Sequence, residues 1–380
     1  MQGNRFSLRH VVLSAAAVVL GSASAMAQQA TGEPIKIGVI VAATGPAASV
    51  GIPERDGVLL AEEVINSRGG VKGRPIRLIV RDDASNPDTA ISHANELIFG
   101  EKVVALIGSS SSASSVAIGG ITHRLKFPQL AFSGFGPAIE RERRCVFHLA
   151  ASQEPNARAM LEYARHIKAK RMGILHDAGF GTIVLNELKR FVEGYGVELV
   201  VAEKFEAGAT DTTTQAAKIK AAQPDAIFVA SVSAAPMRDI RRLQVTQPII
   251  SHFGSSSYEL VNAMGLGADN VIFPEFLVAE DPAPHQKEFV DLYKKKYGTL
   301  PKNFEAFSFD GVHALAEALA KVGPDAGGEA ICEAMRRPYR GVFGHFDFSA
   351  DDMNGIRQSS FLYSKLVNGK YTRLPFTAGN

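Results

Sequence analysis

The fold is decided by the stretch Val103–Pro137, which has the sequence VVALIGSSSSASSVAIGGITHRLKFPQLAFSGFGP. Two short apolar runs within it, Val103–Ile107 and Gln129–Phe132, are bounded by turn residues and do not alternate in polarity. Such runs are typical of buried parallel strands. The segment between them, Ala113–Leu125, has the length of a helix. The stretch therefore predicts a strand–helix–strand unit of a parallel α/β sheet.

Small residues follow both predicted strands: Gly108–Ser112 after the first and Ser133–Gly136 after the second. Ligands of open α/β sheets lie just outside the carboxyl ends of the strands. Serine hydroxyls, backbone N–H groups and a helix N-terminus at that edge suit a carboxylate. The alternative interpretation of the serine run is a flexible loop or an N-cap of the following helix. We expect these loops to form half of a ligand-binding cleft in a protein that does not catalyse.

The composition is that of an ordinary globular protein with more than one domain. The chain has 380 residues, of which 46% are hydrophobic and 21% are charged, so two domains are expected. Without Arg5 and Arg9 near the N-terminus, the 41 Lys and Arg residues fall to 39, which equals the 39 Asp and Glu residues. This balance argues against nucleic acid as a partner, because no basic excess is present to displace phosphate counterions.

Residues 1–27 have the pattern of a secretory signal peptide. Arg5, Arg9 and His10 precede the apolar run Val11–Leu20, and small residues then lead to a predicted cleavage after Ala27. The alternative, a membrane anchor, needs about twice as many apolar residues. No cysteine stands at the predicted cut, which argues against a lipoprotein anchor. We therefore expect an exported, soluble protein.

Apolar periodicity in the rest of the chain predicts two series of alternating strands and helices, and hence doubly wound parallel sheets. The first series adds to the stretch above strands Ile35–Val41 and Pro75–Arg81 and helices Pro53–Ser67 and Asn86–Phe99. The second has strands Arg171–His176, Val197–Phe205, Ala226–Ala230, Ile249–Phe253 and Val271–Phe276, with helices between them. Helices His285–Tyr297, Phe304–Val322 and Gly328–Arg336 follow, and Gly341–Thr372 is predicted to be β structure.

Five stretches carry a family resemblance: Ile35–Pro46 (IKIGVIVAATGP), Ile65–Ile76 (INSRGGVKGRPI), Asp82–Pro87 (DDASNP), Gly108–Ser115 and Phe309–Gly311. They occur in register over nearly all of the chain after the leader. With them the chain resembles the periplasmic leucine/isoleucine/valine-type binding proteins of bacterial ABC importers, which have the type I periplasmic binding fold. At Phe309–Gly311 the family usually has Tyr-Asp-Ala.

The resemblance implies two Rossmann-like lobes joined by three crossovers, near residues 149–154, 278–284 and 341–346. Lobe one would comprise residues 34–150 plus 282–342, and lobe two residues 151–281 plus 343–380. The implied function is that of a periplasmic, monomeric substrate-binding protein that captures a small ligand by hinge closure and delivers it to ABC permease subunits. An alternative is a ligand-sensing module for a separate receptor or regulator.

The resemblance also suggests which residues hold the ligand. In lobe one, Ser112 and the turn Ser133-Gly134-Phe135 match the positions that bind the ligand carboxylate, and Ser111 is a further candidate beside them. In lobe two, Phe180 matches an aromatic residue that lines the cleft. Two aromatic rings at Phe135 and Phe180 would suit an apolar or aromatic carboxylate, although plain core packing explains either ring equally well.

The chain departs from the amino-acid binders of the family at the position of their ammonium-binding acid, where it has Ser256. An unpaired buried ammonium is costly, so this loss favours a carboxylate without an ammonium. Asp177 would be a substitute acid, but an Asp in a D-A-G turn is equally explained by loop geometry. Tyr258 and His252 are candidate polar partners for a ring substituent. The ligand thus remains either an α-amino acid or an aliphatic or aromatic acid.

Cys145 and Cys332 are the only cysteines, and the sequence does not decide whether they are bridged. Family members can carry a disulfide at the positions of Ser85 and Ser111, which is absent here.

No catalytic constellation is present in the sequence. It lacks a G-x-S-x-G elbow, an H-E-x-x-H helix, a C-x-x-C pair and a P-loop, and its histidines have no metal-ligand spacing. We therefore expect no enzyme activity, no metal and no cofactor.

Overall fold

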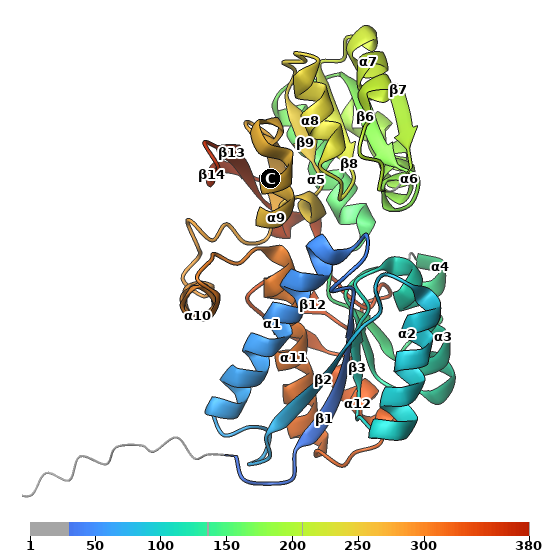
Figure 1. The fold of residues 1–380 in the computed structure, drawn as a ribbon, viewed down its shortest axis with the longest axis vertical. Coiled ribbons are helices and arrows are strands. Elements are labelled where there is room, and N and C mark those ends of the chain that lie inside the picture. The colour runs from blue at the N-terminus through green and yellow to red at the C-terminus, as the bar shows by residue number, and fades with distance from the viewer. Residues whose placement is uncertain (1–29, 135–136, 207, 380) are drawn as a thin grey trace, which may run out of the picture.

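The computed structural model describes residues 30–134, 137–206 and 208–379, and two α/β lobes lie one above the other in Figure 1. The predicted signal peptide lies outside the described residues. Each lobe is built around its own sheet, and the two sheets share no strand. The prediction of two lobes with mainly parallel sheets is therefore confirmed.

The lower lobe in Figure 1 contains a five-stranded sheet of order β2-β1-β3-β4-β5, all parallel. Its strands are β1 (Ile35–Val41), β2 (Ile76–Asp82), β3 (Leu106–Gly108), β4 (Gln129–Ala131) and β5 (Val146–His148). The helices of this lobe are α1 (Ala48–Ser67), α2 (Pro87–Asn95), α3 (Ser112–Leu125) and α4 (Pro137–Glu140), with α11 (Asn303–Val322) and α12 (Gly328–Met335) from later in the chain. The strand order reverses between β1 and β3, and such a switch point opens a crevice for ligands.

The upper lobe contains a seven-stranded sheet of order β14-β13-β10-β9-β8-β6-β7, in which only β13 and β14 are antiparallel to their neighbours. Its strands are β6 (Arg171–Asp177), β7 (Glu198–Phe205), β8 (Ala226–Ala230), β9 (Ile249–Ser251), β10 (Ile272–Glu275), β13 (Leu362–Val367) and β14 (Lys370–Thr377). Its helices are α5 (Gln153–His166), α6 (Phe180–Phe191), α7 (Thr213–Ala222), α8 (Ala235–Arg242) and α9 (Tyr258–Met264). Helix α10 (Lys287–Tyr297) follows β10 in the chain. Strands β11 (Pro338–Arg340) and β12 (His345–Asp347) form a hairpin between α12 and β13.

Most predicted elements are present, and the differences have local causes. Helix α1 begins at Ala48 and contains Pro53, whereas the sequence predicts a start at Pro53, because proline is favoured in the first turn of a helix. The helix predicted to reach Phe99 continues instead as a π-helical segment, Glu96–Glu101. The β structure at the C-terminus forms two hairpins and extends beyond the predicted Gly341–Thr372, because its first strand begins at Pro338 and its last strand ends at Thr377.

Buried polar side chains hold the segments that run between the lobes. Each hydrogen-bonds the backbone of such a segment at distances between 2.7 and 3.1 Å. These side chains are Asn354 on residues 148 and 150, Asn303 on residues 276–277, Asp310 on residues 342–343, and Gln286 on residues 276 and 342. Because all four are buried, these bonds are shielded from competition with water.

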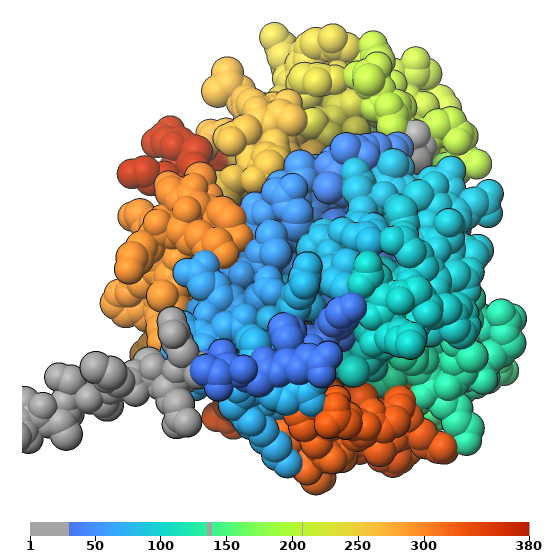
Figure 2. All heavy atoms as spheres, turned by 60° about the horizontal axis from the view of Figure 1, so that its bottom comes forward, coloured from blue at the N-terminus to red at the C-terminus, as the bar shows by residue number. Residues whose placement is uncertain are grey.

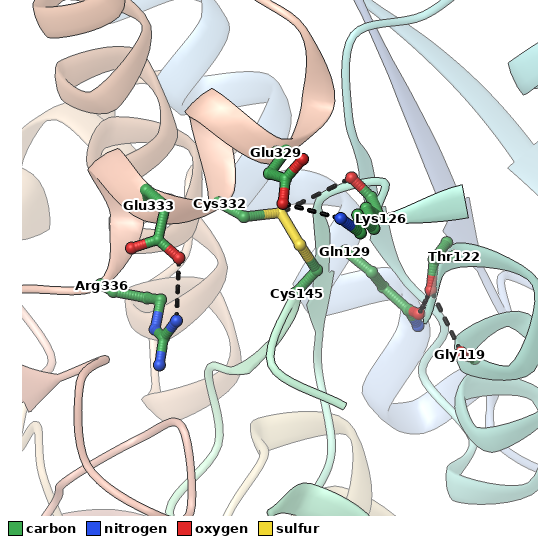
Figure 3. Close-up of a disulfide and its surroundings, with 9 residues drawn as sticks. All are labelled: Gly119, Thr122, Lys126, Gln129, Cys145, Glu329, Cys332, Glu333 and Arg336. Carbon is green, nitrogen blue, oxygen red and sulfur yellow. Dashed lines mark hydrogen bonds and ion pairs between the residues drawn. A yellow bond between two sulfur atoms is a disulfide. The ribbon is translucent and has the colours of Figure 1, made fainter. Parts of the chain in front are cut away.

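Cys145 and Cys332 form a disulfide, which decides the question that the sequence leaves open. Their Cα atoms are 5.3 Å apart, and the bond joins the residue before β5 to helix α12 across 187 positions in the chain (Figure 3). Lys126 and Glu329 form an exposed ion pair of 2.8 Å beside it. The disulfide thus ties the C-terminal helices to the N-terminal part of the same lobe, and Figure 2 shows both parts in one surface.

Glu305 in the first turn of α11 is a buried carboxyl group at the helix start. Its Oε2 accepts the backbone N–H of Lys302 at 2.9 Å, and its Oε1 accepts from the Tyr293 hydroxyl at 3.5 Å. Burial raises the pKa of Glu305 to about 7. The folded protein therefore retains a proton at pH values where the unfolded chain has lost it, so ionisation of Glu305 lowers stability as the pH rises from 5 to 7.

We expect Glu305→Gln to remove this pH dependence, because glutamine keeps an acceptor for the Lys302 N–H and does not ionise. Relative to wild type, the variant should gain about 2 kcal/mol of unfolding free energy between pH 5 and pH 8. Urea unfolding at the two pH values measures this difference. Glu288→Gln, at an exposed ion pair with Arg68, is the control and should show no such gain. A difference for Glu305→Gln that is the same at both pH values would contradict the prediction.

Candidate functional site

A cavity of about 410 Å³ is lined by residues from both lobes. This volume is within the usual range of small-molecule sites. One wall is formed by Ser112, Gly134, Glu140 and Arg141, from α3 and the segment after β4. Helices α5 and α6, with the residue before α5, supply Ser152–Pro155, Arg158, Phe180, Ile183 and Glu187. The loop between β12 and β13 supplies Asp351, Asp352 and Ile356–Gln358.

The serine run after β3 mostly stabilises its own loop. Ser109 Oγ donates to Asp83 at 2.6 Å, and Ser110 Oγ accepts the N–H of Ala42 at 3.0 Å. Ser111 is the N-cap of α3, and its hydroxyl accepts from the N–H of Ser114. The interpretation of the run as a helix N-cap is therefore correct for Ser111. Ser112 is the first residue of α3 and lines the cavity, and its contact with a ligand stays a prediction.

The turn after β4 brings a second predicted residue to the cavity. Gly134 lines it, while Phe135 lies outside the described residues. The carbonyl oxygen of Ser133 accepts from Nδ1 of His148 at 2.6 Å. The Ser133 hydroxyl is buried and has no hydrogen-bond partner within residues 30–134, 137–206 and 208–379.

Phe180 is the predicted site residue that the structure brings to the cavity from the opposite lobe. It is the first residue of α6, and its ring packs edge-on against His252 with 4.6 Å between the ring centres. Asp177, at the end of β6, is not at the cavity. Its Oδ1 accepts the N–H groups of Gly179 and Gly181 at 3.0 and 2.9 Å, so it caps the start of α6, as loop geometry alone would explain.

Ser256 and Tyr258 are also away from the cavity. The hydroxyl of Ser256 is buried between the Phe253 carbonyl, 2.8 Å away, and Glu275 Oε2, 3.1 Å away. The Tyr258 hydroxyl donates to Glu280 at 2.9 Å. Alignment by sequence places Ser256 at the ammonium position of the family, but the structure uses it in an internal polar network.

The cavity also contains charged residues that no motif in the sequence indicates. Asp351, Asp352 and Arg357 lie within Gly341–Thr372, which the sequence predicts only as β structure. Asp352 is already engaged, because its Oδ2 accepts from Ser152 at 3.0 Å and its Oδ1 accepts two backbone N–H groups. Nothing in the sequence signals that this segment, about 200 residues beyond α5, faces the cavity.

Within the described part of the chain, no group of three His, Cys, Asp or Glu side chains is placed to hold a metal ion. None of the helices in that part is long and apolar enough to cross a membrane.

Comparisons with known proteins agree with this geometry. The family described as periplasmic binding protein matches residues 34–369. The Leu/Ile/Val-binding protein homolog 7 of Brucella melitensis is 26% identical to this chain over an alignment 384 residues long. The alignment covers 95% of this chain and 94% of the relative.

Two solved structures share the fold at 23% sequence identity and a TM-score of 0.80. One is the branched-chain amino acid transporter substrate binding protein of Streptococcus pneumoniae in complex with isoleucine, with 90% of this chain and all of that chain covered. The other is an ABC transporter solute binding protein of Rhodopseudomonas palustris in complex with 3,4-dihydroxybenzoic acid, with 91% and 97% covered. The match over residues 34–369, together with the shared fold, shows that this chain belongs to the periplasmic binding protein family.

Proposed function

We infer that the protein is the exported solute-binding component of an ABC importer and captures a small carboxylate-bearing ligand between its lobes. The observation that carries this inference is the cavity itself, which has Ser112 and the start of α3 on one side and Phe180 on the other. Charge-assisted hydrogen bonds from a hydroxyl and helix N–H groups to a carboxylate contribute about 1.5–3 kcal/mol each. A binding role without catalysis also agrees with a family of solute-binding proteins.

We propose that residues 34–150 plus 282–342 and residues 151–281 plus 343–380 move as two bodies about the three crossovers. A ligand that contacts both lobes stabilises the closed form, because only that form offers all of its contacts. The buried side chains on the crossovers keep these segments in place while the lobes rotate. The closed monomer, and not the open one, would then be recognised by the permease subunits.

Two ligand chemistries fit this cavity. An α-amino acid agrees with the isoleucine bound to the S. pneumoniae protein, and Asp351 and Asp352 supply carboxylates in the cavity near which an ammonium could bind. An aromatic or aliphatic acid agrees with the dihydroxybenzoate bound to the R. palustris protein and with the ring of Phe180. Both carry the carboxylate that the start of α3 is suited to bind, which is the common feature of the proposal.

The proposal predicts that branched-chain amino acids or benzoate-like acids raise the melting temperature of the ligand-free mature protein. A ligand at a hundredfold its Kd adds about 2.7 kcal/mol, which is a shift of a few degrees. Because the chain has no tryptophan, an external dye or calorimetry is the suitable readout. Ser112→Ala should weaken binding of the active acid about tenfold through loss of one hydrogen bond.

Ser67→Ala, at the exposed end of α1, is the control for this substitution and should leave the Kd unchanged. A shift with leucine or valine but not with their des-amino analogues identifies an amino-acid carrier. A shift with aromatic or aliphatic acids alone identifies a carrier of acids without an ammonium. If no carboxylic acid of either class raises the melting temperature, the proposed ligand class is wrong.

A further inference from the structure

A buried histidine behind the cavity wall holds one of the amide side chains that line it. His252 follows β9, is 1% exposed, and accepts the N–H of Gly254 on its Nδ1 at 2.9 Å. Its Nε2 lies 3.0 Å from Oε1 of Gln153, the first residue of α5. The same ring packs edge-on against Phe180. One side chain therefore braces two neighbouring residues of the cavity, an amide and an aromatic ring.

The hydrogen positions in this pair follow from the chemistry of the imidazole. Burial lowers the pKa of His252 to about 3, so the ring is neutral near pH 7. A neutral imidazole carries one ring hydrogen, and Nδ1 cannot carry it because that atom accepts from the backbone. Nε2 therefore donates, and the Gln153 atom that faces it must be the amide oxygen. The amide nitrogen of Gln153 is left to donate elsewhere.

Among the described residues, that nitrogen has no hydrogen-bond partner, and Gln153 lines the cavity together with Phe180. We propose that Gln153, held in place by His252, is a specificity-determining residue that donates a hydrogen bond to an oxygen on the part of the ligand that packs against Phe180. This inference rests on the proposed function. It narrows the ligand to a small carboxylic acid whose apolar body carries a second acceptor oxygen, such as a carbonyl or hydroxyl.

A ligand without this oxygen would leave the amide hydrogens unpaired once the lobes close and water is excluded. A donor that loses water without gaining a partner disfavours binding, so the site discriminates against such a ligand. One hydrogen bond of ordinary strength corresponds to about tenfold in affinity. Leucine-type side chains, which have no acceptor, are therefore expected to bind less well than oxygenated acids of the same size.

The test uses pairs of acids that share a carbon skeleton and differ in one carbonyl oxygen. Suitable pairs are 4-methylbenzoate with 4-formylbenzoate, pentanoate with 4-oxopentanoate, and norvaline with 4-oxonorvaline. Calorimetric titration of the mature protein gives a Kd for each acid. On the pair that binds, wild type should prefer the carbonyl compound about tenfold, and Gln153→Leu should reduce the preference to within twofold.

Further variants separate this role from a general effect on folding. Gln153→Glu can still accept from His252 but presents an oxygen to the ligand, so the preference for the carbonyl compound should also disappear. His252→Phe keeps a ring against Phe180 but does not orient Gln153, and should reduce the preference without weakening binding of the plain acid. Gln215→Leu on α7, outside the residues that line the cavity, is the control and should keep the preference.

The possible failures are distinguishable. If an acid binds but wild type shows no preference within a pair, or if Gln153→Leu and Gln153→Glu retain the preference, the role of Gln153 is wrong while the carrier function stands. If none of the six acids, nor any acid of the earlier panel, stabilises the protein, the proposed function fails and the role of Gln153 fails with it.

Discussion

Replacing Lys302 by methionine should lower the free energy of unfolding by about 3–5 kcal/mol, because it leaves a buried carboxylate without its cation. Nζ of Lys302 lies 2.6 Å from Oε1 of Glu275, and the two side chains are 1% and 0% exposed. The same ammonium lies 3.4 Å above the ring centre of Tyr371. The Ser364 hydroxyl and the Asn303 amide also donate hydrogen bonds to the Glu275 carboxylate.

The position of this pair explains why its loss should affect the whole molecule. Lys302 precedes α11, which packs along α1, whereas Glu275 ends β10 in the seven-stranded sheet. Burial raises the pKa of Glu275 and Lys302 opposes that shift, so removal of the lysine favours protonation of the acid. The destabilisation by Lys302→Met should therefore be larger at pH 8 than at pH 5.

Denaturant unfolding of matched variants tests this prediction. Lys126→Met, at the exposed ion pair with Glu329, should change the free energy of unfolding by less than about 1 kcal/mol. The double variant Lys302→Met with Glu275→Gln should recover more than half of the loss, because no buried charge then remains unpaired. A loss below about 1 kcal/mol for Lys302→Met alone would show that the pair is not shielded from water.

Opening the disulfide between Cys145 and Cys332 should lower the free energy of unfolding by about 3–5 kcal/mol. The bond closes a loop of 187 positions that contains the whole seven-stranded sheet except β13 and β14. In the chain-entropy description, the unfolded state loses more freedom the longer the closed loop is. Within the folded lobe, the bond links α12 to the residue before β5, although the two cysteines are 187 positions apart in the chain.

Urea unfolding of wild type with and without a reducing agent measures the effect, and a thiol count confirms reduction. The double variant Cys145→Ser with Cys332→Ser should unfold at the midpoint of the reduced wild type and should not respond to the reducing agent. A reduced wild type with two free thiols and an unchanged midpoint would contradict the prediction. An oxidising compartment, as expected for an exported protein, would keep the bond intact.

Local sequence patterns predicted most of the strands and helices, but neither β5 (Val146–His148) nor β11 (Pro338–Arg340). The limits of β1 and β8 agree with the apolar runs at Ile35–Val41 and Ala226–Ala230, because a buried parallel strand has a continuous apolar signature of its own. Ser112, Gly134 and Phe180 reach the cavity because each follows a strand at its carboxyl end. These predictions depend only on neighbours within one strand–helix unit.

Predictions of which polar side chains face the cavity were less successful than predictions of strands and helices. Asp177 and Ser111 cap the helices that they precede, which is a local use of the side chain that competes with ligand contact. Ser256 was placed at the cleft by alignment, but Glu275, 19 residues later, takes its hydroxyl into the interior. Residue type and position along the chain do not tell which of two available acceptors a hydroxyl will face.

The α/β class, the two series of elements and the family are encoded in periodicity and in contiguous motifs, and can therefore be predicted from the amino-acid sequence. Which residues meet across long separations depends on how the folded chain packs. The tertiary structure joined Cys145 to Cys332, set Lys302 on Glu275, and placed His252 against Gln153, 99 positions apart. Such contacts arise when separate lobes and crossovers pack together, and the pairing of distant side chains leaves no periodic trace in the chain.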